Sequence, residues 1–461
     1  MQEGLHKIVS SEGTIAAVST PLGHSGVGVV RLSGTQVLAI GKRFFRPNTT
    51  AEFDHREALV GRWLDLNSEE IDEVVVTFFR SPHSYTGEDI LEISAHGNPM
   101  ILRRILETAW AAGARVAAPG EFTLRAVARG KLDLIQAEAV REFIEAQTEQ
   151  QAKTALRQMG GSLSKRILPV KNGLIDVIAH LEAGIDFAED DVDVPANTFV
   201  SQKLQPLCEG LSALSESFGY GKILSQGLRL AILGKPNVGK SSLFNRLVAA
   251  DRAIVTDVPG TTRDVLRETI SIEGVPLCLA DTAGVRDTAD RVETIGVTRA
   301  IETLCEADLG LVVLDGSAIL DPNDQQVLEK ARRIPHILVI NKADLPQRLD
   351  TASLNGSRRV LVSAKTGEGL SDLHEALRVF LLSKKTHLAD DLILTSERQH
   401  ETIQRSVAAL TSAARALEWN VPHEMVLLDL YRALGAMDEL TGEVVTDDIL
   451  DRIFSTFCVG K

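Results

Sequence analysis

The sequence has no long apolar run, few cysteines and no excess of positive charge. No segment approaches the about 18 consecutive apolar residues of a membrane span, and the first residues, MQEGLHKIVS, lack a signal-peptide pattern. The four cysteines, Cys208, Cys278, Cys305 and Cys458, are scattered and form no CxxC pair. This usage argues against disulfides and a zinc site. We therefore predict a cytoplasmic protein without a membrane partner.

The charge balance limits the kinds of partner that the chain can bind. A net charge of −14 disfavours a broad nucleic-acid-binding surface, so any contact with nucleic acid is local or shared with a more basic partner. The 44% of hydrophobic residues is typical of a globular protein with ample core. A length of 461 residues suggests roughly three domains of about 150 residues each.

A phosphate-binding loop is predicted in residues 228–242, LRLAILGKPNVGKSS. The apolar run predicts a strand, and the segment from Gly234 to Ser241 fits the pattern GxxxxGK[ST]. Glycines let successive backbone N–H groups point at phosphate oxygens, and the following helix adds its positive N-terminal end. Lys240 would reach the terminal phosphates, and the Ser241 hydroxyl would hold Mg²⁺.

Three further motifs follow in the order expected of a guanine-nucleotide site. Residues 281–284, DTAG, can support the metal and sense the γ-phosphate, and Asp344 of NKAD can accept hydrogen bonds from guanine N1–H and N2–H. The segment SAK, residues 363–365, can offer a backbone N–H to guanine O6. The predicted nucleotide site comprises Asn237, Val238, Gly239, Lys240, Ser241, Ser242, Thr256, Asp257, Val258, Pro259, Gly260, Thr261, Thr262, Asp281, Thr282, Ala283, Gly284, Asn341, Lys342, Ala343, Asp344, Ser363, Ala364 and Lys365.

The loop after the phosphate-binding helix predicts how the nucleotide state is sensed. Thr262, within TDVPGTTRD, is placed to complete the Mg²⁺ shell when the γ-phosphate is present. Ras-like enzymes orient the attacking water with a glutamine after the DxxG glycine, but Val285 occupies that position. The nearby acidic residues Asp287, Asp290 and Glu293 are the local candidates for this task.

The N-terminal segment, residues 1–129, predicts an α+β domain. We expect strands at residues 14–18, 27–32, 71–79 and 90–94, and a helix at 99–112 that stops before Gly113. Polar clusters include Arg31, SYTGE leading to Glu92, and PGEFTLRAVARGKLDL with Lys131. From the residues alone, ordinary turns and surface charge are the favoured explanation of these clusters, and nothing in them fixes a ligand.

The remaining segments predict helices on both sides of the nucleotide-binding domain. One apolar stripe runs through residues 163–181, another through 200–218, and further helices are expected at 396–419, 423–440 and 447–457. We therefore predict a discontinuous helical domain, residues 130–226 and 386–461, with an inserted P-loop domain of mostly parallel sheet at 227–385. Cys458, near the chain end, could be a reactive thiol or a small packed residue.

Several segments together resemble one family. GKPNVGKSS, GTTRD, DTAGVRD, NKAD and SAKTGEGL resemble the TrmE–Era–EngA–Septin-like group of bacterial GTPases. TPLGHSGVGVVRLSG, SYTGEDILEISAHG, PGEFTLRAVARGKLDLIQAEAV and the terminal FCVGK are similar to the MnmE (TrmE) family of tRNA-modification GTPases. The likeness extends from Thr14 to Lys461, with small departures at Ser25 and Val459.

The resemblance implies a cellular task. Family members are homodimers that assemble into a heterotetramer with an FAD-dependent subunit, GidA or MnmG. The pair installs a carboxymethylaminomethyl or aminomethyl group at C5 of the wobble uridine of certain tRNAs. The carbon comes from a tetrahydrofolate derivative, 5,10-methylene-tetrahydrofolate, while 5-formyl-tetrahydrofolate binds the same N-terminal domain.

The resemblance also implies roles for single residues. Arg31, Glu92, Lys131 and Lys461 would bind the folate, and Cys458 would be the functional thiol. Asn237 and the backbones of Thr256, Val258 and Thr261 would hold K⁺, and Glu293 would position the catalytic water.

Two alternatives share the same nucleotide motifs. An Era- or EngA-like ribosome-assembly switch should carry a basic KH-like RNA domain after the nucleotide-binding domain, whereas the residues after about Leu388 predict helices. The other alternative is a free-standing folate enzyme with a regulatory GTPase.

Overall fold

The computed structural model describes residues 13–50, 52–186, 196–251, 267–280, 307–351, 354, 358–384 and 393–460. Two compact units are present: the first comprises residues 1–141, 158–207 and 405–461, and the second comprises 142–157 and 208–404. The multidomain α/β class is confirmed, because each unit combines helices with a sheet of its own. The domain boundaries expected at residues 129, 226 and 385 stay predictions.

The first unit contains a seven-stranded sheet in the order β3-β4-β5-β6-β2-β1-β7. Neighbouring strands are antiparallel except β1 and β7, which are parallel. Four of the strands agree with the prediction, namely β1, β2, β5 and β6, whereas β3, β4 and β7 were not predicted. The strands are β1 (Ile15–Val18), β2 (Ser25–Ser33), β3 (Phe45–Pro47), β4 (Ala58–Leu64), β5 (Glu70–Phe79), β6 (Ile90–Gly97) and β7 (Arg115–Val116).

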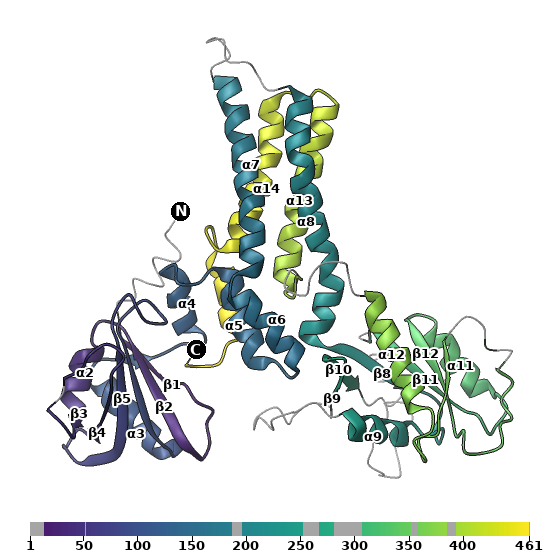
Figure 1. Ribbon diagram of the computed structural model, residues 1–461, viewed down its shortest axis with the longest axis horizontal. Coiled ribbons are helices and arrows are strands. Elements are labelled where there is room, and N and C mark those ends of the chain that lie inside the picture. The colour runs from purple at the N-terminus through teal and green to yellow at the C-terminus, as the bar shows by residue number, and fades with distance from the viewer. Residues whose placement is uncertain are drawn as a thin grey trace. The chain divides into compact units, whose positions relative to one another are not determined.

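Helices pack against this sheet (Figure 1). Helices α2 (Val37–Phe44) and α3 (Pro99–Ala111) bury their apolar sides in the main core of the sheet. The predicted start of α3 is confirmed: the Asn98 side chain accepts a hydrogen bond from Met100 N at 2.9 Å, and Pro99 occupies the first turn. On a smaller second core, Phe122 of α4 (Glu121–Ala128) packs with Ile15.

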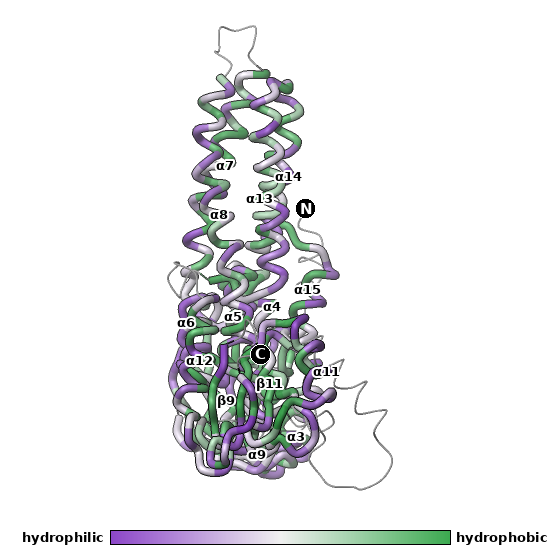
Figure 2. Tube along the Cα trace, turned by 90° about the vertical axis from the view of Figure 1, so that its right-hand side faces the viewer, coloured by the Kyte–Doolittle hydropathy of each residue, from purple (hydrophilic) through white to green (hydrophobic). Residues whose placement is uncertain are grey.

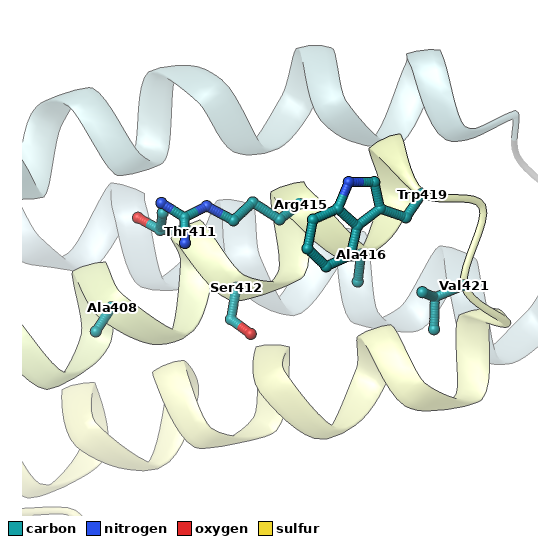
Figure 3. Close-up of a pocket in the computed structure, with 7 residues that line it drawn as sticks. All are labelled: Ala408, Thr411, Ser412, Arg415, Ala416, Trp419 and Val421. Carbon is teal, nitrogen blue, oxygen red and sulfur yellow. The ribbon is translucent and has the colours of Figure 1, made fainter.

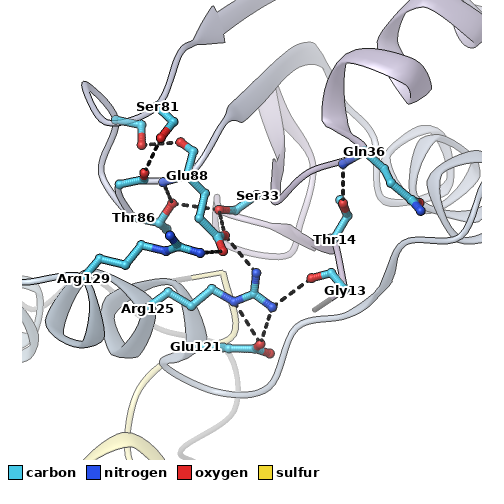
Figure 4. Close-up of polar contacts among 12 residues, drawn as sticks. Gly13, Thr14, Ser33, Gln36, Ser81, Thr86, Glu88, Glu121, Arg125 and Arg129 are labelled. Carbon is cyan, nitrogen blue, oxygen red and sulfur yellow. Dashed lines mark hydrogen bonds and ion pairs between the residues drawn. The ribbon is translucent and has the colours of Figure 1, made fainter. Parts of the chain in front are cut away.

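A buried carboxylate ties α4 to the sheet (Figure 4). Glu88 accepts hydrogen bonds from Arg125 Nη1 at 2.8 Å, Arg129 Nη2 at 2.7 Å and Ser33 Oγ at 2.7 Å. Burial alone would raise the pKa of Glu88, but the hydrogen bonds from Arg125 and Ser33 and the two arginine charges outweigh it and lower the pKa. The ionised Glu88 carboxylate therefore stabilises the fold at pH values above 4.5, the ordinary pKa of glutamate, and this stabilisation is lost as the pH falls through the lowered pKa of Glu88.

Arg125 is the centre of this network. Its side chain is 5% exposed, and besides Glu88 it binds Glu121 Oε1 at 3.0 Å and Gly13 O at 2.9 Å. Glu121 is equally buried and also pairs with Arg115. One arginine therefore neutralises two buried carboxylates from different segments.

Helices α5 to α8 and α13 to α15 form the described segments that precede and follow the second sheet in the sequence. In the first unit, α7 packs along α14, and the predicted stripe of α7 is confirmed because Leu163, Ile167, Leu174, Ile178 and Leu181 are all buried. Figure 2 shows hydrophobic and hydrophilic residues alternating along α7. Among the described helices, none is both long and apolar enough to cross a membrane. The helices are α5 (Leu134–Glu145), α6 (Glu149–Met159), α7 (Ser162–Asp186), α8 (Asn197–Gln226), α13 (Glu397–Glu418), α14 (His423–Thr441) and α15 (Asp447–Phe454).

The second unit contains a six-stranded sheet in the order β13-β12-β11-β8-β10-β9. All neighbours are parallel except β9 and β10, so the predicted mostly parallel sheet is confirmed. Helices α9 and α12 pack in one core and α11 in another. The elements are β8 (Leu228–Leu233), α9 (Lys240–Asp251), β9 (Arg267–Ile272), β10 (Val275–Ala280), β11 (Leu309–Asp315), α11 (Pro322–Ala331), β12 (His336–Asn341), β13 (Arg359–Leu361) and α12 (Leu370–Lys384).

The buried network in the first unit gives a stability prediction. Replacing Arg125 by methionine keeps much of its volume but removes the cation that Glu88 and Glu121 share, so each carboxylate keeps one arginine, Arg129 and Arg115 respectively. Because hydrogen bonds to charged groups stabilise more than neutral ones, we expect the free energy of unfolding to fall by about 2–3 kcal/mol.

Urea unfolding followed by tryptophan fluorescence measures this loss. In a Trp419→Phe background the signal comes from Trp63 and Trp110, which both belong to the N-terminal residues. The control is Arg103→Met, which breaks an exposed ion pair within α3 and should cost less than about 1 kcal/mol. An Arg125→Met loss no larger than that of the control would contradict the prediction.

Candidate functional site

The phosphate-binding loop connects β8 to α9, as predicted from the sequence. Gly239 precedes the helix with φ +97°, and a Cβ atom there would lie 2.2 Å from Asn341 Nδ2. A side chain at this position would therefore displace Asn341 from the loop. The loop brings Asn237, Val238, Lys240, Ser241 and Ser242 to the start of α9.

Lys240 is held by the backbone of its own loop. Its Nζ donates to Gly234 O at 2.9 Å and to Lys235 O at 2.8 Å. The ammonium group therefore lies beside the backbone turn whose N–H groups are suited to bind phosphate.

Lys235 joins the same loop to α11, and sequence reasoning did not assign it a role. Its Nζ lies 2.7 Å from both Asp321 Oδ2 and Asp324 Oδ2. The hydrogen bonds that Lys235 donates to these two carboxylates raise the pKa of Lys235. Asp321 is also the N-cap of α11 and forms a capping box with Asp324. A capping box is visible in the sequence, but its lysine partner is 86 positions away and has no sequence signal.

Asn341 connects the phosphate-binding loop to the predicted guanine-binding loop. This side chain is 3% exposed; its Nδ2 donates to Val238 O at 2.7 Å, and its Oδ1 accepts from Ala364 N at 2.9 Å. Both polar atoms of the amide are therefore used, and each holds a different loop.

The other predicted base-reading residues lie next to Asn341. Ser363 Oγ donates to Asp344 Oδ1 at 2.7 Å, and this hydrogen bond is the main reason that the pKa of Asp344 is lowered. Asp344 is exposed and ionised, so it presents a hydrogen-bond acceptor. Lys342, with φ +67°, pairs with Asp315 at 2.5 Å, a partner that the sequence did not indicate.

The structure thus brings together the described members of the predicted nucleotide site from three loops. Residues 256–262 and 281–284, together with Glu293 and Lys461, lie outside the part of the chain that the structure describes. The same holds for Val285, Asp287 and Asp290.

A second candidate site surrounds Arg31 in the first unit. Arg31 on β2 is the register partner of Glu92 on β6, and its Nε donates to Glu92 Oε1 at 2.8 Å. Its guanidinium lies 5.9 Å from the Tyr85 ring centroid and 5.8 Å from that of Phe122. This arginine is therefore enclosed by two aromatic rings and a carboxylate, and its side chain is only 17% exposed.

The C-terminal tail reaches the same arginine. Gly460 O accepts hydrogen bonds from Ser19 Oγ at 3.2 Å and from Arg31 Nη1 at 3.5 Å. A Cβ atom on Gly460, where φ is +97°, would lie 2.3 Å from Val18 O, so only glycine permits this approach. Cys458 is exposed, which does not fit a packed structural thiol.

Lys131 has a different neighbourhood. Its Nζ donates to Pro82 O at 3.1 Å, and its stem lies beside Gly87. The structure therefore brings together Arg31, Glu92 and the tail, and it places Lys131 at the loop of residues 81–89.

A surface pocket of about 510 Å³ lies on helix α13 of the first unit (Figure 3). Figure 3 shows the Arg415 side chain extended along the helix toward Thr411, with the Trp419 indole beside the backbone end of that side chain. Its seven lining residues include none of the predicted site residues.

Comparisons with known proteins match both units. A family model described as the MnmE helical domain matches residues 134–458, and one described as the GTP-binding protein TrmE N-terminus matches residues 14–131. The tRNA modification GTPase MnmE of Koribacter versatilis is 48% identical over 454 residues, which cover 98% of this chain and 99% of the relative. The tRNA modification GTPase MnmE of Aquifex aeolicus is 44% identical, and the match covers 97% of this chain and 99% of the relative. The protein of the same name from Alkaliphilus oremlandii is 40% identical, and the match covers 98% of this chain and 99% of the relative.

The position of Asn341 gives a prediction for nucleotide binding. Asn341→Ala leaves Val238 O and Ala364 N without their buried partner, and each such loss costs about 1–3 kcal/mol. We therefore expect the Kd for Mg·GDP, measured by calorimetry, to rise by roughly 10- to 100-fold.

The matched control is Asn323→Ala, on the exposed first turn of α11. It should bind Mg·GDP as the unmodified protein does. Equal affinity of the Asn341→Ala and Asn323→Ala proteins would show that the bridge between the loops does not support nucleotide binding.

Proposed function

Since the chain belongs to the MnmE family of tRNA modification GTPases, we propose that its GTP hydrolysis drives one modification at the wobble uridine of certain tRNAs. The modification attaches a carboxymethylaminomethyl or aminomethyl group to C5. It uses a one-carbon unit from 5,10-methylene-tetrahydrofolate. The observation that carries this proposal is the presence, in one chain, of a guanine-nucleotide loop set and a separate arginine–glutamate site reached by the tail.

The nucleotide assignment follows from the loops around Asn341. Lys240 would exchange its loop carbonyls for phosphate oxygens, which are better partners for an ammonium group. Ser241 would hold Mg²⁺ together with Thr262, and the metal would neutralise charge on the phosphates. Asp344 would read the N1–H and N2–H groups of guanine, and the loop of residues 363–365 would read O6.

A potassium ion is proposed beside the phosphates. Asn237 in the phosphate-binding loop and the backbones of Thr256, Val258 and Thr261 would supply its oxygen ligands. Its positive charge would act where other GTPases use an arginine. Because Val285 cannot orient water, we assign that task to Glu293.

The folate derivative is proposed to bind at the Arg31 cluster. The half-buried Tyr85 ring offers a face on which a flat pterin can stack, and Glu92 offers a carboxylate for its N–H groups. Arg31, Lys131 and Lys461 would supply positive charge for the glutamate tail. Cys458, exposed three residues before the chain end, is proposed as the functional thiol.

The proposed assembly is a homodimer that forms a heterotetramer with the FAD-dependent GidA/MnmG subunit in the cytoplasm. A more basic partner would explain how a chain with net charge −14 acts on tRNA. The proposed folate-binding domain comprises residues 1–129, and the GTPase domain comprises residues 227–385. The helical domain comprises the segments on both sides of the GTPase domain, residues 130–226 and 386–461. The Era- or EngA-like alternative is disfavoured, because residues 393–460 form helices α13, α14 and α15 where a KH-like domain was required.

Mass spectrometry of tRNA nucleosides tests the proposed reaction. Cells that lack this protein should lose the C5-modified wobble uridines, and the full chain should restore them. A Cys458→Ser chain should bind folate and hydrolyse GTP yet fail to restore modification, because serine is a much weaker nucleophile than a thiolate.

The control is Cys208→Ser, which should restore modification fully. Normal modification by the Cys458→Ser chain would refute the assigned thiol. Unchanged wobble nucleosides in cells lacking the protein would refute the reaction itself.

The proposed potassium site predicts a cation dependence of GTP hydrolysis. Turnover should be faster in K⁺ than in Na⁺, since the smaller ion fits a cage of fixed oxygens poorly. By analogy with an arginine finger, the gain could reach the order of 10³-fold. The Asn237→Ala protein should respond less to K⁺, and equal rates of the unmodified protein in both salts would contradict the site.

A further inference from the structure

Arg246 on helix α9 contacts the predicted guanine-binding loop from the side of the phosphate-binding helix. Its Nη2 donates to Lys365 O at 2.6 Å, and its Nε donates to Ala364 O at a longer 3.4 Å. These are consecutive carbonyls, and a guanidinium group is a rigid planar fork of N–H donors. One side chain therefore fixes two neighbouring peptide groups at once.

The geometry of the peptide bond turns this contact into a constraint on base recognition. The carbonyl of Ala364 and the N–H of Lys365 belong to the same planar trans peptide, so they point in opposite directions. Holding the carbonyl toward Arg246 therefore directs the Lys365 N–H away from α9. The preceding N–H, that of Ala364, donates to Asn341 Oδ1.

The rest of the loop is held by its own hydrogen bonds. Gly367 N donates to Ser363 O at 2.8 Å, Ser363 N donates to Glu368 O at 2.9 Å, and Thr366 N donates to Ser363 Oγ at 3.1 Å. These bonds close the turn around residues 366–368. Arg246 and Asn341 hold the stretch between them, Ala364 and Lys365, from outside the loop.

We propose that Arg246 is a positioning residue for base specificity, which directs the Lys365 N–H toward the 6-oxo group of the purine. The inference rests on the proposed use of residues 363–365 as the guanine-reading loop. Arg246 lies on α9, the helix that begins at Lys240. The phosphate-binding helix therefore also holds the loop that reads the base.

Purine nucleotides that differ at one ring position separate this role from general support of the domain. GDP and inosine diphosphate carry the 6-oxo group, whereas 2-aminopurine riboside diphosphate lacks it. We expect Arg246→Ala to weaken binding of GDP and inosine diphosphate by about tenfold, the usual effect of losing a charged hydrogen bond. Binding of the 2-aminopurine nucleotide, measured by competition on the full chain, should be unchanged.

Two further variants make the test specific. Arg246→Lys keeps the positive charge but loses the planar pair of N–H donors. It should therefore weaken binding of GDP and inosine diphosphate by about threefold and leave the 2-aminopurine nucleotide unaffected. This variant replaces Arg246→Ala if the alanine variant does not fold. Arg378→Ala removes an arginine whose partner is Glu375 on its own helix, and it should change none of the affinities.

The outcomes separate the inference from the proposed function. Equal weakening of all three nucleotides, or no weakening of GDP, would overturn the positioning role of Arg246. An unmodified protein that binds ADP as tightly as GDP would overturn the proposed guanine site, and the inference with it.

Discussion

The amide of Asn341 is the contact on which the nucleotide site depends. It joins loops that lie 103 and 23 positions away in the sequence, and it uses its donor for one and its acceptor for the other. The bridge requires that β8 and β12 end at the same edge of the sheet, which parallel strands allow. It also requires glycine at position 239, where a side chain would occupy the place of the amide.

The Arg31 cluster is built by a different constraint, the register of antiparallel strands. Pairing of β2 with β6 sets Arg31 opposite Glu92, and a shift by one residue would send the two side chains to opposite faces. The tail reaches this pair because Phe457 is buried in a core with Leu124 of α4. In this way the last residues of the chain become part of a site formed by the first hundred.

Helices and strands with a regular apolar pattern were predictable. The stripe of α7 and the alternation of β5 and β6 indicate buried faces that the structure confirms. Strand β4 was missed because Val60 faces outward, which blurs the alternation, and Gly61 interrupts it. Helix α2, of eight residues, is too short for its pattern to repeat, so packing against the sheet decides its formation.

By itself, the sequence determined which loops form and in what order, because glycine, lysine and capping residues act on the backbone next to them. It indicated Lys240 and Asp344, since each belongs to a local pattern, whereas Arg31 and Glu92 were assigned only through the resemblance to a family. Only the tertiary structure decided that Arg246 holds the loop of Ala364 and Lys365, that Lys235 pairs with two carboxylates of α11, and that Gly460 meets Arg31. These contacts join residues far apart in the chain, and their distances are set by how whole sheets and helices pack rather than by any neighbouring residue.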